Sequence, residues 1–134
     1  MVTRLRAPLS EESIRLTPRE HYLEACHRGA YSHERYIEFM VRSIETCAKC
    51  GLKRIFVDIT GLTDFHPSTT QRYEMGNVGS TRGALLERVA VFGTAEQLDS
   101  RFSTMVARNR GLNVQSFTDR DEALEWLLQD GGRT

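Results

Sequence analysis

The sequence predicts one α/β domain built on a mostly parallel β-sheet. Two segments, Arg54–Ile59 and Arg88–Phe92, are short, almost entirely apolar and rich in β-branched residues, as strands buried on both faces are. Stretches with helical periodicity alternate with segments of this kind along the chain. Strands that alternate with helices form parallel sheets with right-handed crossovers, so the expected order of elements is ββαβαβαβα.

Composition narrows the class of protein. A chain of 134 residues fits a single domain. It carries 18 basic and 18 acidic side chains, a balance that gives no general attraction to nucleic acid or to an anionic membrane. Apolar runs are too short for a membrane span, and the N-terminus lacks the apolar segment of a secretory signal. We therefore expect a cytoplasmic protein.

The first part of the chain is expected to hold a hairpin and a helix. Residues 1–12 show no periodicity and are interpreted as a flexible arm before a domain of residues 13–130. Ser13–Thr17 and His21–Arg28 flank a turn with proline, which predicts a β-hairpin at the edge of the sheet. A helix should begin after Ser32 and end before Gly51. Its expected apolar stripe is Ile37, Met40, Val41, Ile44, Cys47 and Ala48.

Two aromatic residues of this first helix fall beside the expected stripe. Tyr36 and Phe39 lie near or off it, and would form a contact patch if both were exposed.

The second helix has the least certain pattern. Pro67 can occupy the first position of a helix that runs through Ser68–Asn77. Three glycines, Gly76, Gly79 and Gly83, are expected to bend or divide it, because glycine weakens a helix interior.

The last third of the chain predicts two more helices around one strand. Thr94 and Gln97 have the spacing of a capping box for a third helix, which Gly111 ends. Its expected stripe is Leu98, Phe102, Met105 and Val106. Asn113–Phe117 is the last expected strand, and Thr118 or Asp119 caps the final helix. Its inward face is Ala123, Leu124, Leu127 and Leu128, with Gly131 and Gly132 after it.

The strand and turn Val57–Thr63, with the sequence VDITGLT, resemble those of STAS domains, the SpoIIAA-like fold of anti-sigma-factor antagonists. The segment Gly29–Ser32 is similar to the motif that ends a strand before the first helix of these domains. The resemblance spans about residues 13–129. More specifically, the chain resembles the STAS/SEC14 group of small bacterial proteins. It implies a SpoIIAA-like fold with an N-terminal hairpin.

The resemblance also implies a role for Ser68. In typical members a DSSG motif heads the second helix, and its last serine is phosphorylated by a partner kinase that is also the anti-sigma factor. Ser68 takes that serine's place, while His66, Pro67 and Thr69 stand where the motif has Asp, Ser and Gly. The residues themselves allow two interpretations of Ser68: a hydroxyl that caps a helix, or a phosphorylation or anion site at a helix N-terminus.

Function is expected where the strands end. In open parallel sheets, ligands and partners meet the loops at the carboxyl ends of the strands. We call this edge the rim, and we expect it to be formed by residues 29–33, 60–68, 93–96 and 118–121. Its candidate residues, besides Ser68, are Asp58, Thr60, Asp64, His66, Thr94 and Thr118.

No catalytic or metal site is expected. Asp64, His66 and Ser68 share one short turn, where a histidine rarely bridges a serine and an aspartate as a triad requires. Asp58 is expected to bond amides of the turn around Gly61, or to join a site with Asp64 and His66. The three cysteines, Cys26, Cys47 and Cys50, indicate free thiols of a reducing compartment. The Cys47-x-x-Cys50 pair falls at a helix C-terminus, which disfavours the thiolate that redox chemistry needs.

The sequence thus favours a non-enzymatic regulatory or protein-interaction module of STAS-like type. Its expected partners are another protein and a second copy of the chain, with no nucleic acid, no membrane span and no cofactor. The alternative is a small-molecule or lipid-binding domain that uses the rim or the cleft beside the second helix.

Overall fold

The computed structural model describes residues 13–98 and 112–129. They contain a five-stranded sheet with the strand order β1-β2-β4-β6-β7. Its first pair is an antiparallel hairpin and its other pairs are parallel, so the predicted α/β class, mostly parallel sheet and N-terminal hairpin are confirmed. The strands are β1 (Ile14–Pro18), β2 (Leu23–His27), β4 (Arg54–Asp58), β6 (Arg88–Phe92) and β7 (Val114–Phe117).

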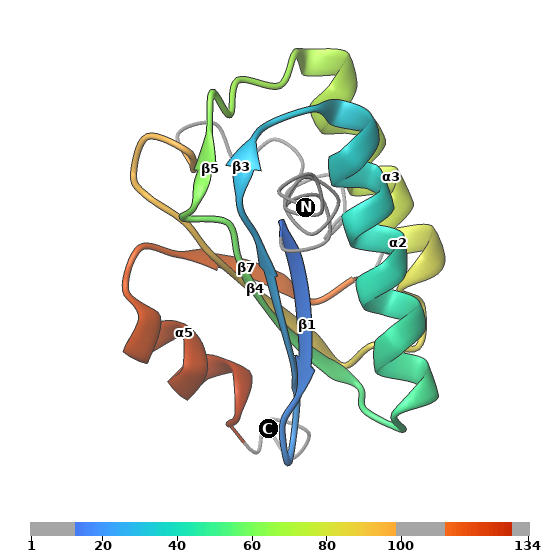
Figure 1. The fold of residues 1–134 in the computed structure, drawn as a ribbon. Coiled ribbons are helices and arrows are strands. Elements are labelled where there is room, and N and C mark those ends of the chain that lie inside the picture. Colours follow the sequence, from blue (N-terminus) through green and yellow to red (C-terminus); the bar gives the residue numbers. More distant parts are fainter. Residues whose placement is uncertain (1–12, 99–111, 130–134) are drawn as a thin grey trace, which may run out of the picture.

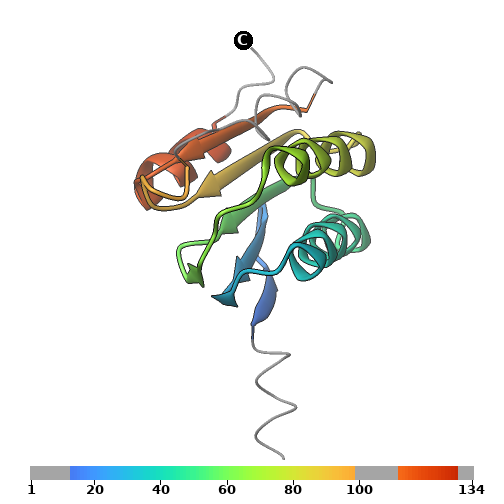
Figure 2. The ribbon, with the colours of Figure 1, turned by 90° about the horizontal axis from the view of Figure 1, so that it is seen from above.

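The described helices are α2 (His33–Lys49), α3 (Thr69–Arg82) and α5 (Arg120–Leu127). Helices α2 and α3 cover one face of the sheet and α5 covers the other, which gives three layers (Figure 1, Figure 2). The arm expected over residues 1–12 and most of the third expected helix, with Phe102, Met105 and Val106, lie outside the described residues.

Strand β4 is buried on both faces, as its apolar sequence predicts. Neighbouring residues of a strand point to opposite faces. Ile55 packs into the cluster beneath α2 and α3, and Phe56 packs with Ala123 and Leu127 of α5. The relative exposures of Ile55 and Phe56 are 2% and 0%. Both layers of helices are therefore anchored on this strand.

Helix α2 begins and ends at the predicted places. The Ser32 hydroxyl accepts from the amide of Arg35 at the N-terminus. At the other end Gly51 has φ +70, and the amides of Gly51 and Leu52 donate to the carbonyls of Ala48 and Cys47. This is a Schellman motif, which only a residue that tolerates the left-handed region closes without strain.

The buried face of α2 differs from the expected stripe. Tyr36 and Phe39 are buried, at 8% and 1% exposure, so the prediction that they lie near or off the buried stripe is wrong. Ile37, Met40 and Ile44 are only half-buried. The reason is that α2 contacts both the sheet and α3, so its covered arc is turned away from the position that periodicity alone indicates.

Helix α3 also departs from expectation. It begins at Thr69 with Ser68 as its N-cap, so Pro67 lies before the helix, and it runs without interruption to Arg82. Gly76 and Gly79 lie on its buried face. A Cβ added to Gly79 would lie 3.5 Å from Met40 Cε and 3.6 Å from Leu112 Cδ2. Close packing on α2 thus overrides the weak helix propensity of glycine.

Three arginines attach α5 to the sheet. At its C-terminus, Arg54 donates to the carbonyls of Leu127 and Gln129, each at 3.0 Å. Arg88 donates to the carbonyl of Trp126 and stacks over its ring. Cations suit the negative end of a helix dipole. Near its N-terminus, Arg120 donates to Glu24 Oε2 at 3.1 Å, so both ends of α5 are bonded to strands.

We expect Gly79→Ala to stabilise the protein by about 1 kcal/mol, because alanine is the better helix former and its methyl group would make ordinary contacts. Gly83→Ala is the matched variant of opposite sign, since its Cβ would lie 2.6 Å from the Gly79 carbonyl oxygen. Urea unfolding measures both. A lower midpoint for Gly79→Ala would contradict the packing described for α3.

A buried histidine predicts how stability depends on pH. His27 is 2% exposed and stacks on Phe39. Its Nδ1 donates to the Ser13 carbonyl, and its buried Nε2 makes no hydrogen bond with any described residue. Burial lowers the pKa of His27 below its ordinary value, with a smaller effect from Arg35, while the Ser13 bond and Glu38 oppose the shift. The unfolded chain therefore binds a proton at His27 more tightly than the folded chain does.

We therefore expect the contribution of His27 to stability to be complete above about pH 6.5, the pKa of an unperturbed histidine, and to be lost as the pH falls below it. Urea unfolding of the wild type and of His27→Phe between pH 7.5 and 5 tests this. The wild type should lose stability more steeply, because phenylalanine keeps the stacking and does not titrate. Parallel curves for the two proteins would exclude His27 as the group responsible.

Candidate functional site

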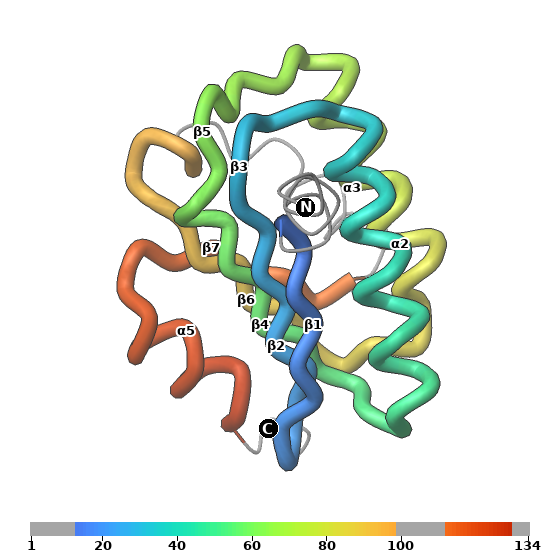
Figure 3. The backbone as a smooth tube through the Cα atoms, in the orientation of Figure 1, coloured from blue at the N-terminus to red at the C-terminus, as the bar shows by residue number. Residues whose placement is uncertain are grey.

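The rim is built around a small second sheet that the sequence did not predict. Strands β3 (Gly29–Ala30) and β5 (Leu62–Thr63) pair in parallel beyond the ends of β2 and β4 (Figure 3). The amide of Gly29 donates to Gly61 O at 3.1 Å, and that of Tyr31 donates to Thr63 O at 2.9 Å. Strands of two residues have no periodicity to reveal them, so the loops after β2 and β4 are joined in a way only the structure shows.

Gln97 bonds the loop after β6 to the turn between β4 and β5. The predicted capping-box bonds are present: Gln97 N donates to Thr94 Oγ1 at 3.1 Å, and Thr94 N donates to Gln97 Oε1 at 2.9 Å. The amide nitrogen of Gln97 also donates to Ile59 O at 2.8 Å and to Leu62 O at 3.1 Å. Gln97 is 8% exposed, so these bonds satisfy carbonyls away from water.

Asp58 and Thr60 lie together in the turn after β4. Asp58 Oδ1 accepts from the Thr60 amide at 2.9 Å and from the Thr60 hydroxyl at 2.7 Å. Its Oδ2 lies 3.7 Å from Arg120 of α5. Asp58 therefore bonds the turn, as one of the two sequence interpretations held, and the structure adds the neighbouring guanidinium.

Arg120 was not singled out from the sequence, where one arginine after an N-cap carries no signal. Arg120 forms ion pairs with Glu24 and Asp58. Its guanidinium also lies over the ring of Phe56, with 4.7 Å between Arg120 Cζ and the ring centroid. Burial of the Glu24 carboxyl raises its pKa, but hydrogen bonds and charge from Arg19 and Arg120 outweigh burial and hold that pKa below its usual value. Arg120 thus links the start of α5 to two strands.

Ser68 is exposed and caps α3 in a complete capping box. Its hydroxyl accepts from the amide of Gln71 at 3.1 Å, and its own amide donates to Gln71 Oε1 at 2.9 Å. Arg72 lies close by, because its Nε donates to the Pro67 carbonyl at 3.2 Å. The capping interpretation is realised in the structure, and the phosphorylation of Ser68 stays a prediction.

The other predicted rim residues are exposed and are not assembled into a reactive group. Asp64 has the left-handed φ of 55°, and its carbonyl accepts from the amide of His66 at 3.0 Å. Within the described part of the chain, the side chains of Asp64, His66 and Ser68 make no hydrogen bond or ion pair with one another. Thr118 is exposed, and the neighbouring Asp119 caps α5 by accepting from the amide of Glu122.

An aromatic cluster lies under the rim. The ring of Tyr31 lies 5.1 Å from Phe65 and 6.0 Å from Tyr36, measured between centroids. The Tyr31 hydroxyl lies 3.1 Å from His33 Nδ1, and His33 Nε2 lies 2.8 Å from Glu74 Oε1 on α3. Burial raises the pKa of Tyr31 to about 12, so its hydroxyl stays protonated. This cluster connects the rim with the starts of α2 and α3.

None of the three cysteines lies in a loop of the rim. Cys26 is in β2, Cys47 is in α2 and Cys50 follows α2. Cys47 is buried, and its Sγ donates to Leu52 O at 3.2 Å. Burial raises the pKa of Cys47 to about 11 and raises that of Cys26, so both thiols stay protonated near neutral pH. Cys50 is exposed at the C-cap of α2. In the parts of the chain that are described, no three metal-ligating side chains are grouped to hold an ion.

The arrangement of strands and loops can be compared with solved structures. One match is an uncharacterized protein of the DUF3478 family from Shewanella loihica PV-4, whose fold is described as SpoIIAA-like. The chains are 26% identical, the match covers 85% of this chain and 91% of the other, and the TM-score is 0.55. The fold is SpoIIAA-like. No family model matches the sequence, and no curated protein matches it either.

The SpoIIAA-like fold confirms the resemblance inferred from the VDITGLT turn and from the order of elements. In this fold Ser68 is the N-cap of α3, and Asp58 and Thr60 lie in the turn after β4. Within the described ranges, no helix is both long and apolar enough to cross a membrane. The rim of the SpoIIAA-like domain is a surface of hydrogen-bonded loops that carries exposed hydroxyl and charged groups.

We expect Gln97→Leu to cost about 2 kcal/mol of stability, because it keeps the side-chain size but removes the donor of two buried carbonyls. Gln71→Leu is the matched control, since Gln71 holds the same position in the exposed capping box of α3 and should cost no more than about 1 kcal/mol. Urea unfolding compares the two variants. Equal losses would show that Gln97 contributes only through its bonds with Thr94.

Proposed function

We propose that this SpoIIAA-like domain is a non-enzymatic regulatory module that binds a protein partner through its rim. One observation carries the proposal: the loops of the rim are bonded to one another in series. Strands β3 and β5 join the first two loops, and Gln97 bonds the third to the second. Gly93 N of the third loop donates to Phe117 O at 3.1 Å, at the end of β7, where the fourth loop begins. A surface fixed in advance binds a partner with less loss of conformational entropy.

Ser68 is the proposed point of regulation. Its hydroxyl is exposed at a helix N-terminus, where amide groups and the helix dipole favour a phosphate. Arg72 supplies a cation near this position through its bond to Pro67 O. A phosphate would add negative charge to the rim and so change the partner's affinity. This role is carried over from the resemblance to STAS domains.

Location and assembly complete the proposal. A cytoplasmic protein fits the free thiols, of which Cys50 is exposed. Bacterial origin is carried over from the resemblance to the STAS/SEC14 group. Strand β1 ends the order of the five-stranded sheet and has a single strand neighbour among the described residues. An unpaired edge accepts a strand from another chain, which supports a homodimer as the second part of the proposal.

Site-specific photo-crosslinking tests the rim. A photoreactive side chain replaces His66, which is exposed on the rim, and in a control it replaces Lys53, which is exposed at the start of β4 at the opposite end of the sheet. We expect crosslinking in the native host to yield a discrete protein adduct from position 66 and none from position 53. Identical adducts from both positions, or none from either, would contradict binding through the rim.

Ser68 variants then test the regulation. Ser68→Asp adds a negative charge and Ser68→Thr keeps a hydroxyl that can cap α3. We expect the yield of the adduct from position 66 to fall at least severalfold with Ser68→Asp and to be kept with Ser68→Thr. An unchanged yield with Ser68→Asp would separate Ser68 from partner binding while leaving the rim as the interface.

A further inference from the structure

One face of the sheet is covered along only part of its width. Helix α5 packs on β4, β6 and β7, and Figure 2 shows it near β6 and β7 and away from β1. Among the described helices, none covers β1 and β2 on this side of the sheet. Helices usually cover both faces of a parallel sheet, so the uncovered half of this face calls for an explanation.

The uncovered half is formed by the side chains that alternate with the core residues of the hairpin. Leu23 and Ala25 of β2 pack in the cluster beneath α2 and α3, so their neighbours in the strand point to the opposite side. We call this surface the open face. It includes Arg15 and Arg19 from β1 and its turn, and Tyr22, Glu24, Cys26 and Arg28 from β2 and its two ends.

The open face is basic at the end nearest the rim. Arg15 and Arg28 are exposed, and their guanidinium groups make no hydrogen bond or ion pair with any described residue. Arg15 pairs with Cys26, two residues before Arg28, so the two arginines are diagonal neighbours about 7–8 Å apart in the ladder. Two like charges at this separation repel each other.

The acidic group of the open face is already neutralised. Glu24 accepts from Arg19 at 2.8 Å and from Arg120 of α5 at 3.1 Å. The two guanidinium groups thus bind its carboxylate from opposite sides and leave no acid for the other arginines. The charge that complements Arg15 and Arg28 therefore has to come from outside the open face.

Helix α5 carries that charge on its outer side. Ala123 packs toward the sheet, and Asp121 and Glu125 each lie about 200° around the helix from it. Both acids are exposed, and neither makes an ion pair with any described residue. Asp121 lies in the first turn, where it suits the helix dipole. Glu125 lies beyond that turn and repels Asp121 four residues before it.

The position of α5 along the strands is set by its two ends. Its start lies at the rim, where Arg120 lies 3.7 Å from Asp58. Its last turn lies at the opposite end of the sheet, where Arg54 at the start of β4 donates to Leu127 O. The acidic side chains therefore lie toward the rim, and Leu128, which is 41% exposed, lies at the far end.

We propose that the open face is the docking surface for α5 of a second copy of this chain, so that the domain forms a twofold dimer. The inference rests on the homodimer of the proposed function and names the surfaces that meet. A twofold axis along the strands, between the two α5 helices, keeps the rim ends of both copies together, and each contact occurs twice. The acidic side of α5 then meets Arg15 and Arg28 of the other copy, and Leu128 meets Tyr22.

Charge and layering both select this occupant. The chain has no net charge, and its basic open face is complemented by an acidic helix beside it. In the dimer the two α5 helices lie side by side between the two sheets, so the second copy supplies the cover that β1 and β2 lack in one chain. Both rims face the same way, which allows bivalent binding of a partner with two sites.

Charge reversal of the full chain tests the inference. The face variant carries Arg15→Glu and Arg28→Glu, and the helix variant carries Asp121→Lys and Glu125→Lys. Sedimentation velocity compares their masses with the 15.3 kDa of one chain. We expect the wild type to be a dimer at high micromolar concentration. In each variant alone the dimer Kd should rise by about a hundredfold or more, because like charges meet across the interface.

Mixing the two variants should restore the dimer. The substituted face of one then meets the substituted helix of the other, and the two unchanged surfaces also meet. A control with Arg42→Glu and Lys49→Glu changes the charge equally on α2, in the other layer. It should dimerise like the wild type. Mixed with the helix variant, it should leave that variant monomeric, which shows that opposite net charge alone is not sufficient.

The outcomes separate this inference from the homodimer on which it rests. A monomeric wild type would overturn both. A dimer that persists in the face and helix variants would keep the homodimer, through another surface such as the edge of β1, and would exclude the open face. Failure of the mixture to dimerise would also overturn the inference. If circular dichroism shows that the face variant does not fold, the helix variant decides alone, since a dimer of unchanged Kd excludes its α5 from the interface.

Discussion

Burial of β4 on both of its faces is the constraint on which the rest of the structure depends. Ile55 contacts the layer of α2 and α3, and Phe56 contacts the layer of α5, so one strand positions all the described helices. Its carboxyl end also delivers Asp58 and the turn to β5 at the rim. A strand buried in this way must be apolar between its two ends, and the rim begins where that requirement stops, at the carboxylate of Asp58.

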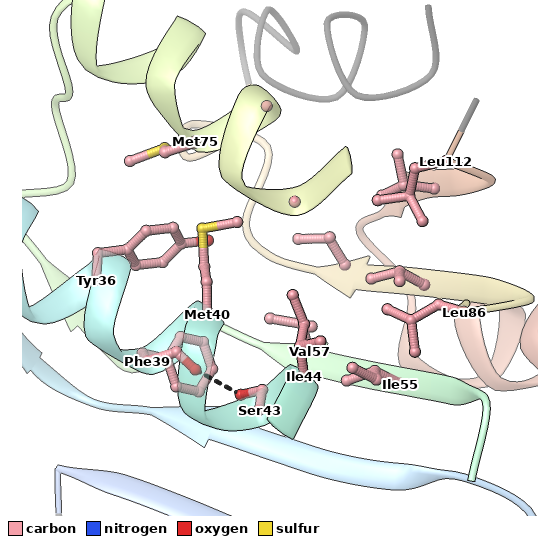
Figure 4. A pocket seen from close by; sticks show the side chains of 15 residues that line it. Tyr36, Phe39, Met40, Ser43, Ile44, Ile55, Val57, Met75, Leu86 and Leu112 are labelled. Atoms are coloured by element: carbon pink, nitrogen blue, oxygen red, sulfur yellow. Dashed lines mark hydrogen bonds between the residues drawn. The ribbon is translucent and has the colours of Figure 1, made fainter. Parts of the chain in front are cut away.

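Tyr36 belongs both to the aromatic cluster under the rim and to the lining of a cavity of about 100 Å³ between α2, α3 and the sheet (Figure 4). Its ring lies in the aromatic cluster under the rim, with Tyr31 and Phe65, and its hydroxyl faces the cavity beside Met40. A glycine face on α3 lets α2 and α3 approach while leaving space beneath them.

The sequence predicted the local features because their signals are local. The apolar runs at Arg54–Ile59 and Arg88–Phe92, the caps at Ser32 and Thr94, and the Schellman glycine Gly51 each depend on residues within a few positions of one another. The order of these elements and the VDITGLT turn were sufficient to infer the SpoIIAA-like fold.

Tertiary structure alone decided how distant residues meet. No local pattern shows that Gln97 bonds carbonyls of another loop, or that Arg120 reaches Glu24 and Asp58. Gly76 and Gly79 looked like helix breakers because propensity is a weak local preference, and packing on α2 outweighs it. The candidate residues could thus be named from the sequence, whereas the bonded rim, the aromatic cluster and the cavity depend on contacts between elements that only folding brings together.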